Sequence, residues 1–220
     1  MKFAKILPYM GMFQNGVIMT LKYTALSLVL GIILGLLIGI VKLSDGKVCK
    51  IFKPVTYAFT AIFRGVPLMV MLYLVFYATP QVLGFPLSAL GAGVAVFGLN
   101  TAAMTSEVFR AGIVSVPRGQ TEAAIALGVQ KRQAMMDIVI PQALKSILPA
   151  IVNESISLLK TTSLISVLGV ADIMRTSNLV LAQTYTAFEP FIFAAVIYFI
   201  LVYILTFFAN MLERGLRKGD

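Results

Sequence analysis

The sequence contains no histidine and a single cysteine, Cys49. One cysteine excludes a disulfide within the chain, and without histidine a Cys/His metal site is implausible. The same shortage removes the Ser–His and Cys–His pairs that nucleophilic catalysis uses. A phosphate-binding G-x-x-x-x-G-K-[ST] sequence is also missing, so any ATP chemistry belongs to a partner. We therefore expect a chain that is not an enzyme and that binds neither a metal nor a cofactor of its own.

Charged residues are also scarce, at 12% of the 220 residues, whereas 59% are hydrophobic. A soluble domain of this length needs more polar surface, so the bilayer must serve as part of the solvent. A net charge of +9 would suggest nucleic acid as the partner of a soluble protein. Here the basic residues gather in short segments between apolar runs, where they orient a membrane protein, and we expect no nucleic-acid partner.

Five apolar runs are each long enough to cross a hydrocarbon core of about 30 Å as a helix. Within lipid, helices satisfy their own backbone hydrogen bonds, and these runs do not alternate like barrel strands. The first run is also too long for a cleavable signal core. The sequence predicts a single all-α integral membrane domain, residues 1–220, with five transmembrane helices at about 17–41, 55–78, 87–108, 144–170 and 188–212.

Basic residues predict the orientation, because lysine and arginine concentrate on the cytoplasmic side of a membrane protein. Most of the 18 fall on one side of a five-span chain: Lys42, Lys47, Lys50, Lys53, Arg110, Arg118, Lys131, Arg132, Lys145, Arg214, Arg217 and Lys218. The other side has Lys2, Lys5 and Arg175. We expect a multi-pass cell-membrane protein with its amino terminus outside and its carboxyl terminus in the cytoplasm. Residues Met1–Asn15 should lie on the outer surface, with Phe3, Ile6, Leu7 and Met10 on one helical face.

Glycine and proline mark two features inside the spans. Gly31, Gly35 and Gly39 recur at a spacing of four, which lets another helix approach closely, so this face should pack against protein. Gly65 and Pro67 should kink or break the second span. A broken helix lines the transport site in some carriers, but a proline kink is also a common packing feature.

A long polar segment, Arg110–Lys145, separates the third and fourth spans. Pro117 is a plausible start for a short helix, Gly128 interrupts that helix, and Pro141 precedes the fourth span. Periodicity leaves two interpretations open: a lever rigidly joined to two spans, or an amphipathic helix held at the surface by its basic residues.

The residue order in this segment resembles a known motif. Glu122-Ala123-Ala124, Gly128, and the run from Ile138 to Pro141 match the E-A-A-x3-G-x9-I-x-L-P loop of ABC importer permeases, with Ile140 replacing the usual Leu. Three further segments look like the histidine/glutamine/arginine permease group: SEVFRAGIVSVPRGQTEAAIALG, PQALKSILPAIVNESISLLKTTSLISVLGVADIMR and LERGLRK. The likeness covers about residues 16–218.

The resemblance implies a mechanism and a set of partners. In that family the loop forms a cytoplasmic coupling helix, here between the third and fourth spans, that seats in a groove of an ATP-binding subunit. Two such subunits bind ATP and Mg, two permease subunits, identical or paired, form the pathway, and an extracytoplasmic protein delivers the amino acid. The coupling contact would fall on Gln120, Glu122, Ala123, Ala124, Gly128 and Pro141.

Polar residues within the spans are candidates for substrate binding. Glu154 lies near the expected bilayer midplane, where a charge costs roughly 2.5–3.5 kcal/mol and therefore faces protein, water or ligand. Asn153 directly precedes it, and Ser157, Leu158 and Thr161 lie on the same face as Glu154 and give a partly polar stripe. Asn100 lies at comparable depth in the third span and completes the expected polar pocket.

Two interpretations of Glu154 remain open. It pairs with Arg64 or Lys160 and fixes the helix packing, or it is the counter-charge for the amino group or side chain of a basic substrate such as arginine, histidine or lysine. In the second case Arg64 and Lys160 are free to meet the substrate carboxylate, although Lys160 can equally extend toward a membrane interface. Glu107 and Arg110, three residues apart, are expected to form a structural pair.

The alternatives differ in cargo and in energy source. The same kind of permease for glutamine or cystine would use Glu154 equally well, through the α-amino group. A secondary transporter or channel often shows internal repeats, and this sequence has no convincing one. Co-purification with an ATPase would separate these classes.

Overall fold

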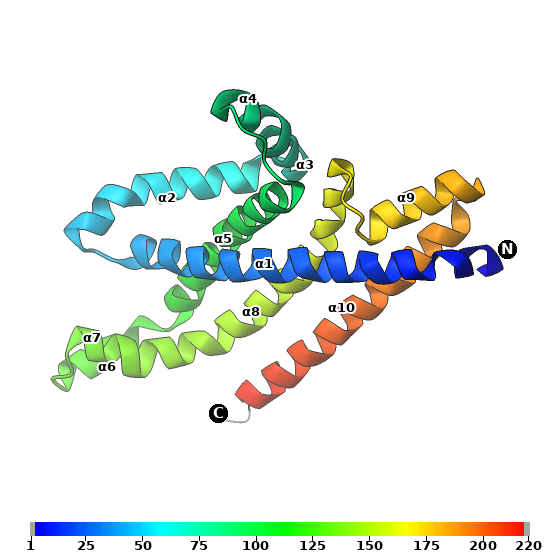
Figure 1. The fold of residues 1–220 in the computed structure, drawn as a ribbon. Helices are drawn as coiled ribbons and strands as arrows, with labels where there is room; N and C mark the ends of the chain where they lie inside the picture. Colours follow the sequence, from blue (N-terminus) through cyan, green and yellow to red (C-terminus); the bar gives the residue numbers. More distant parts are fainter. Residues whose placement is uncertain (1–2, 218–220) are drawn as a thin grey trace.

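Figure 1 shows the computed structural model of the chain, which describes residues 3–217 and side chains from Lys5 to Gly215. These residues form helices and no strand. Lys2 and Lys218, two charges used for the orientation, lie outside the described residues. The elements are η1 (Phe3–Tyr9), α1 (Met10–Leu43), α2 (Lys47–Gly65), α3 (Leu68–Tyr73), η2 (Leu74–Ala78), α4 (Thr79–Leu83), α5 (Ala89–Ser115), α6 (Arg118–Ala126), α7 (Lys131–Ala134), η3 (Met135–Val139), α8 (Ile140–Thr161), η4 (Thr162–Leu168), α9 (Ile173–Thr184) and α10 (Phe188–Arg217).

Four helical runs in the described residues are long and apolar enough to cross a membrane. They are Lys5–Leu43, Ala89–Ser115, Lys131–Leu168 and Phe188–Gly215. A fifth crossing exists if the bent pair Lys47–Gly65 and Leu68–Leu83 counts as one span. The all-helical prediction is therefore confirmed, and four of the five predicted spans correspond to continuous helical runs.

The second predicted span is broken where Gly65 and Pro67 predicted it. Its two halves, α2 and the run from α3 to α4, meet at an angle of 106°. Proline has no N–H to donate and pushes the preceding residue out of the helical region, so Val66 is extended, with φ −94° and ψ 132°. The Pro67 carbonyl then accepts from the Val70 and Met71 N–H groups and starts the next helix. Residues 55–78 are consequently two helical segments joined at an elbow.

The glycine-marked face of α1 packs on α5, as predicted. A Cβ on Gly31 would lie 2.5 Å from Thr101 Cβ, and one on Gly39 would lie 3.2 Å from Phe109 Cβ. The small face also permits a direct polar contact, because Thr105 Oγ1 donates to the Gly31 carbonyl at 3.0 Å. The glycines thus allow α1 and α5 to approach backbone to backbone.

The amino-terminal surface helix predicted for residues 1–15 is only partly present. Residues Phe3–Tyr9 form a 3₁₀ segment that leads directly into α1, so Met10 already belongs to the long helix. Ile6 is buried with Phe13 and Val180, whereas Leu7 is exposed. The side chain of Phe3 lies outside the described residues. The other three, Ile6, Leu7 and Met10, do not form one outward face, because α9 and α10 cover Ile6.

The polar segment between the third and fourth spans is more helical than predicted. Arg110 lies within α5, and Pro141 and Lys145 lie within α8, which begins at Ile140 rather than near Leu144. The non-helical backbone is therefore confined to short turns around α6. The helices α7, η3, α8 and η4 follow one another without a break from Lys131 to Leu168.

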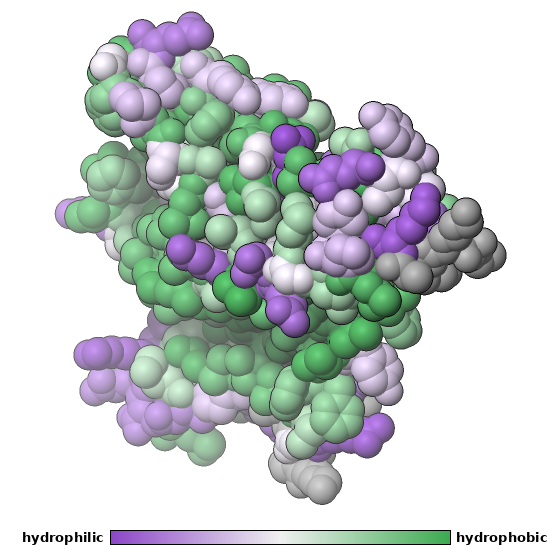
Figure 2. All heavy atoms as spheres, turned by 45° about the vertical axis from the view of Figure 1, so that its right-hand side comes forward, coloured by the Kyte–Doolittle hydropathy of each residue, from purple (hydrophilic) through white to green (hydrophobic). Residues whose placement is uncertain are grey.

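The carboxyl-terminal part of the fold contains α9, which the sequence analysis did not predict, and α10. Asp172 caps α9, since its Oδ1 accepts from the Arg175 N–H at 2.8 Å. Most side chains of α10 stay exposed, among them Phe199, Tyr203 and Phe207. Figure 2 shows large hydrophobic areas on one face of the chain, as expected for a protein surrounded by lipid or by other subunits.

Candidate coupling surface and substrate site

The short helix α6 has defined ends. It begins after Pro117, whose carbonyl accepts from the Gln120 N–H at 3.0 Å, which confirms the predicted start. It ends at Ala126, and Gly128, two residues later, has φ +81°. The Val129 N–H donates to the Ala124 carbonyl and the Gly128 N–H to the Ile125 carbonyl, a Schellman arrangement with glycine in the left-handed position. The predicted interruption at Gly128 is confirmed, and its reason is this backbone conformation.

The predicted coupling residues occupy different surfaces of this region. Gln120, Glu122, Ala123 and Gly128 are exposed, whereas Ala124 is buried beneath them at 5% exposure. Pro141 is exposed in the first turn of α8. Ala124 therefore packs α6 against the chain, and Gln120, Glu122 and Ala123 lie on the exposed side of this helix.

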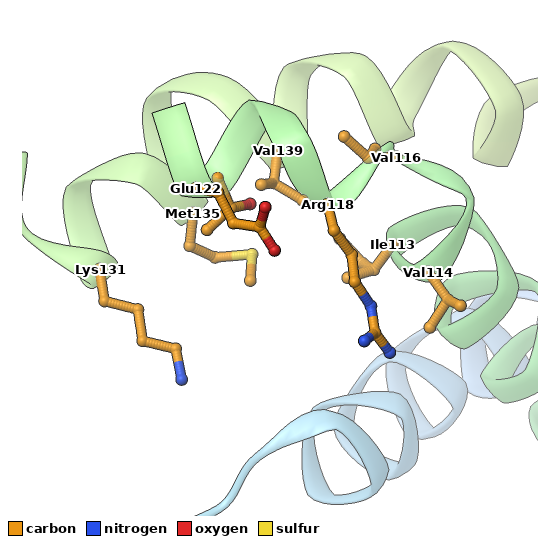
Figure 3. Close-up of a pocket in the computed structure, with 9 residues that line it drawn as sticks. Ile113, Val114, Val116, Arg118, Glu122, Lys131, Met135 and Val139 are labelled. Carbon is orange, nitrogen blue, oxygen red and sulfur yellow. The ribbon is translucent and has the colours of Figure 1, made fainter. Parts of the chain in front are cut away.

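Glu122 also borders a hollow beneath α6. Figure 3 shows Arg118 and Glu122 from α6 and Lys131 from α7 around this hollow, with Val116, Met135 and Val139 among its apolar lining. The π-helical turn η3, Met135–Val139, forms one side of it. The two basic side chains extend to the same side in this view.

A cluster of charges connects α5, near the end that leads into α6, with α1 and α2. Lys42 Nζ lies 2.6 Å from Glu107 Oε1, and Arg110 Nε lies 2.9 Å from Glu107 Oε2. The Glu107–Arg110 pair is therefore confirmed. Lys42 was counted among the basic residues of the cytoplasmic side, but its side chain has 0% exposure in the last turn of α1, because α2 and α5 enclose it. Lys42 Nζ also donates to Thr60 Oγ1 and Ser106 Oγ, both at 3.2 Å.

Glu154 lies at the middle of the helical run from Ile140 to Leu168. It is half-buried, whereas Asn153 and Ser157 are exposed and Leu158 is buried in the core with Tyr23 and Phe97. Thr161, also half-buried, donates its hydroxyl to the Ser157 carbonyl at 2.9 Å. The expected polar stripe is thus divided: Glu154 and Thr161 follow its inner edge, and Asn153 and Ser157 its outer edge.

The structural partners suggested for Glu154 do not reach it. Among the described residues, neither Arg64 nor Lys160 lies within ion-pair distance of this carboxylate. Both basic side chains are exposed, Arg64 at the elbow after α2 and Lys160 near the end of α8. Asn100 is half-buried on α5, and within the described part of the chain it makes no hydrogen bond to α8. Among the described residues, Glu154 is therefore a carboxyl group inside a span without an ionic partner.

Asp172 is a buried carboxylate that the sequence analysis did not single out. It lies between the fourth and fifth predicted spans, with 0% exposure, beside Tyr198 of α10. Burial raises the pKa of its carboxyl to about 6, although backbone N–H groups of α9 and the Arg175 charge act to lower it. Its position directly before Ile173 is a helix-capping signal that would have revealed α9.

Comparison with known families gives a match over most of the chain. Residues 31–218 match the family described as binding-protein-dependent transport system inner membrane component. The arginine transport system permease protein ArtQ of Bacillus subtilis is 40% identical over 99% of this chain and 98% of its own length. The putative glutamine transport system permease protein GlnP of Rickettsia felis is 39% identical over 96% and 95%, respectively.

Solved structures share the fold. A chain in a crystal structure of an amino acid ABC transporter with histidines superposes with a TM-score of 0.91, at 38% identity, over 98% of this chain and 99% of that one. A chain of the MetNI methionine ABC transporter, in an inward-facing conformation, gives a TM-score of 0.78 at 22% identity, over 95% and 98%. The second match supports the fold alone.

Proposed function

Because the chain belongs to the family of binding-protein-dependent transport system inner membrane components and is a permease subunit of an amino-acid ABC importer, we propose that its cargo is a basic amino acid such as arginine, histidine or lysine. The observation that carries the proposal is Glu154, a half-buried carboxylate at the middle of a membrane-crossing helix without an ionic partner in the described residues. An unpaired charge at this depth is costly unless a ligand or water meets it. A cationic substrate supplies the missing charge.

The membrane arrangement in this proposal has five spans, the bent α2–α4 run counting as one. The amino terminus is outside and the carboxyl terminus is in the cytoplasm, which places Lys47, Lys50, α6 and the basic end of α10 on the inner side. A second permease subunit completes the pathway, since the polar edge of α8 is partly open in one chain. An ATP-binding subunit, present in two copies, and an extracytoplasmic amino-acid-binding protein complete the importer.

In the proposed mechanism α6 is the coupling helix. It is joined to α5 through Val116 and Pro117 and leads through α7 and η3 into α8, which carries Glu154. A force applied to α6 by the ATP-binding subunit therefore acts on two spans at once. Gln120, Glu122 and Ala123 form the contact and Ala124 holds the helix down. Gly128 sets the turn after α6, and Pro141 lies in the first turn of α8, directly after η3. Asn100, Asn153, Ser157, Thr161 and Arg64 supply the polar groups around the substrate.

The alternative cargo is another polar amino acid. Relatives named for glutamine transport are as similar as the one named for arginine transport, and the glutamate/aspartate import permease protein GltK of Escherichia coli O157:H7 is 32% identical over 96% of this chain. In this alternative Glu154 binds the α-amino group common to all amino acids. A secondary transporter or channel is set aside, because the family works with a binding protein.

The test compares Glu154→Gln with the wild-type chain in proteoliposomes that contain the complete importer. A charge-assisted contact contributes about 1.5–3 kcal/mol, so arginine uptake should fall roughly 10- to 100-fold while assembly with the ATP-binding subunit stays intact. Asp137→Asn, which removes an exposed carboxylate from η3 in the same helical run, is the control.

The pattern across substrates separates the two cargo proposals. Selective loss of arginine, histidine and lysine uptake supports a basic cargo. Equal loss for glutamine supports recognition of the α-amino group, and unchanged uptake by Glu154→Gln overturns the substrate role altogether.

A further inference from the structure

Two hollows meet on the side of the chain that carries α6. One, of about 420 Å³, lies between the end of α1, α5 and the start of α8, and its lining is apolar, including Leu36, Ile40, Phe109, Leu144 and Ile147. The other, of about 390 Å³, is the hollow beneath α6. Ile113 and Met135 line both, so the hollows adjoin. We call the two neighbouring hollows together the inner groove, which has an apolar end and a charged end.

The charged end has an excess of positive charge. Arg118 and Lys131 border it together with Glu122, and Figure 3 shows both basic side chains extending to the same side. Neither basic group lies within ion-pair distance of a carboxylate in the part of the chain that the structure describes. Two cations and one carboxylate around an open hollow are complementary to an anionic group.

The apolar end lies within the membrane-crossing segments. Leu36 and Ile40 belong to α1 and Leu144 to α8, and each side chain is 39% exposed or more. Exposed apolar side chains at this depth face lipid hydrocarbon or another subunit, and a hollow of this volume is within the range of small-molecule binding sites. An occupant that satisfies both ends has a long apolar part and an anionic head.

We propose that the inner groove binds one anionic phospholipid, with an acyl chain between α1, α5 and α8 and the phosphate at Arg118 and Lys131. Basic pockets between transmembrane helices on the cytoplasmic side favour such headgroups. The proposal rests on the membrane orientation proposed above, but not on the identity of the transported amino acid. Because one side of the headgroup site is formed by α6 and α7, the bound lipid adds contacts between the coupling helix and the spans.

The test measures lipid retained by the complete importer. The complex is purified in mild detergent, incubated with phosphatidylglycerol or phosphatidylcholine, and analysed by native mass spectrometry. We expect one phosphatidylglycerol per permease subunit, in preference to phosphatidylcholine. Arg118→Gln combined with Lys131→Gln should weaken phosphatidylglycerol binding about 30-fold, which corresponds to about 1 kcal/mol for each basic side chain.

Two control variants separate the groove from general effects of charge and bulk. Lys50→Gln combined with Arg214→Gln removes the same charge from exposed positions outside the groove and should leave binding unchanged. Ile40→Trp fills the apolar end and should also reduce retention, whereas Ile33→Trp, at an exposed position earlier on α1, should not.

Several results would overturn the proposal. One is equal phosphatidylglycerol binding by the wild type and the Arg118/Lys131 variant, and another is equal binding of the two lipids. Loss of the ATP-binding subunit from the Arg118/Lys131 variant would assign the charged end to that subunit. Separation of the permease subunits by Ile40→Trp would assign the apolar end to the second permease. Because retention is measured without transport, these results are distinguishable from a failure of the proposed cargo.

Discussion

Lys42 is a fully buried charge whose hydrogen-bond acceptors come from two other helices. Thr60 lies on α2, and Ser106 and Glu107 lie on α5, while Arg110 holds the second oxygen of Glu107. The ammonium group thus joins three spans at the end nearest α6. Its sequence context, in a run of spaced lysines after an apolar segment, indicated a surface charge. Burial of this kind depends on tertiary packing, which the local sequence does not contain.

This cluster gives a prediction about stability. Glu107→Gln removes the anion that neutralises Lys42 and Arg110, so it should destabilise the folded importer by about 3 kcal/mol, as expected when one partner of a buried pair is lost. Lys42→Met should have a smaller effect, because Glu107 keeps Arg110. The measurement is the thermal unfolding of the purified complex at constant lipid and detergent.

The control for this prediction is the more exposed pair of Lys53 and Asp45, 3.7 Å apart. An exposed pair contributes up to about 1 kcal/mol, so Lys53→Met should have little effect. Equal losses of stability for Glu107→Gln and Lys53→Met would contradict the account of Lys42 as a joint between helices.

At the scale of elements, hydropathy predicted the long helices, and glycine and proline predicted the elbow. Continuous apolar runs suffice for α5 and α10, and Gly65 with Pro67 predicted the break after α2. The boundaries around η3 were not predicted, because polar residues continue a helix as readily as they end one. The helix α9 was missed since it is short and amphipathic, and its signal is the capping residue Asp172.

The end of α6 gives a prediction that isolates backbone conformation. A Cβ added to Gly128 meets nothing within 4 Å, but φ is +81°, so Gly128→Ala costs about 1–2 kcal/mol through strain alone. The turn should open and substrate-stimulated ATPase activity should fall several-fold. Gly119→Ala also adds a Cβ in open space but without a positive φ, so it should leave coupling intact.

Hydrogen exchange supplies a second measurement for this pair of variants. The amides of Gly128 and Val129 donate to the carbonyls of Ile125 and Ala124, and they should exchange faster in Gly128→Ala than in Gly119→Ala. Identical exchange and identical ATPase activity in the two variants would show that the left-handed turn does not position the coupling helix.

At the scale of the whole molecule, one chain leaves much of its apolar surface exposed and divides its polar groups among separate places. The proposed coupling surface lies on α6, the charged cluster around Lys42 lies where α1, α2 and α5 meet, and Glu154 lies midway along the run from Ile140 to Leu168. The chain connects these places through continuous helix from Lys131 to Leu168. Such an arrangement suits a subunit that transmits a movement made elsewhere to a binding site within the membrane.

The most direct test of this account is uptake of labelled arginine by the reconstituted importer. The permease and its ATP-binding subunit are reconstituted in proteoliposomes together with the binding protein. ATP, or a non-hydrolysable analogue in its place, is supplied on the side of the membrane that carries the ATP-binding subunit. The account predicts arginine accumulation that requires ATP hydrolysis and the binding protein. With the analogue, each importer should complete at most one transport cycle. Accumulation that persists without hydrolysis and follows an ion gradient would contradict it.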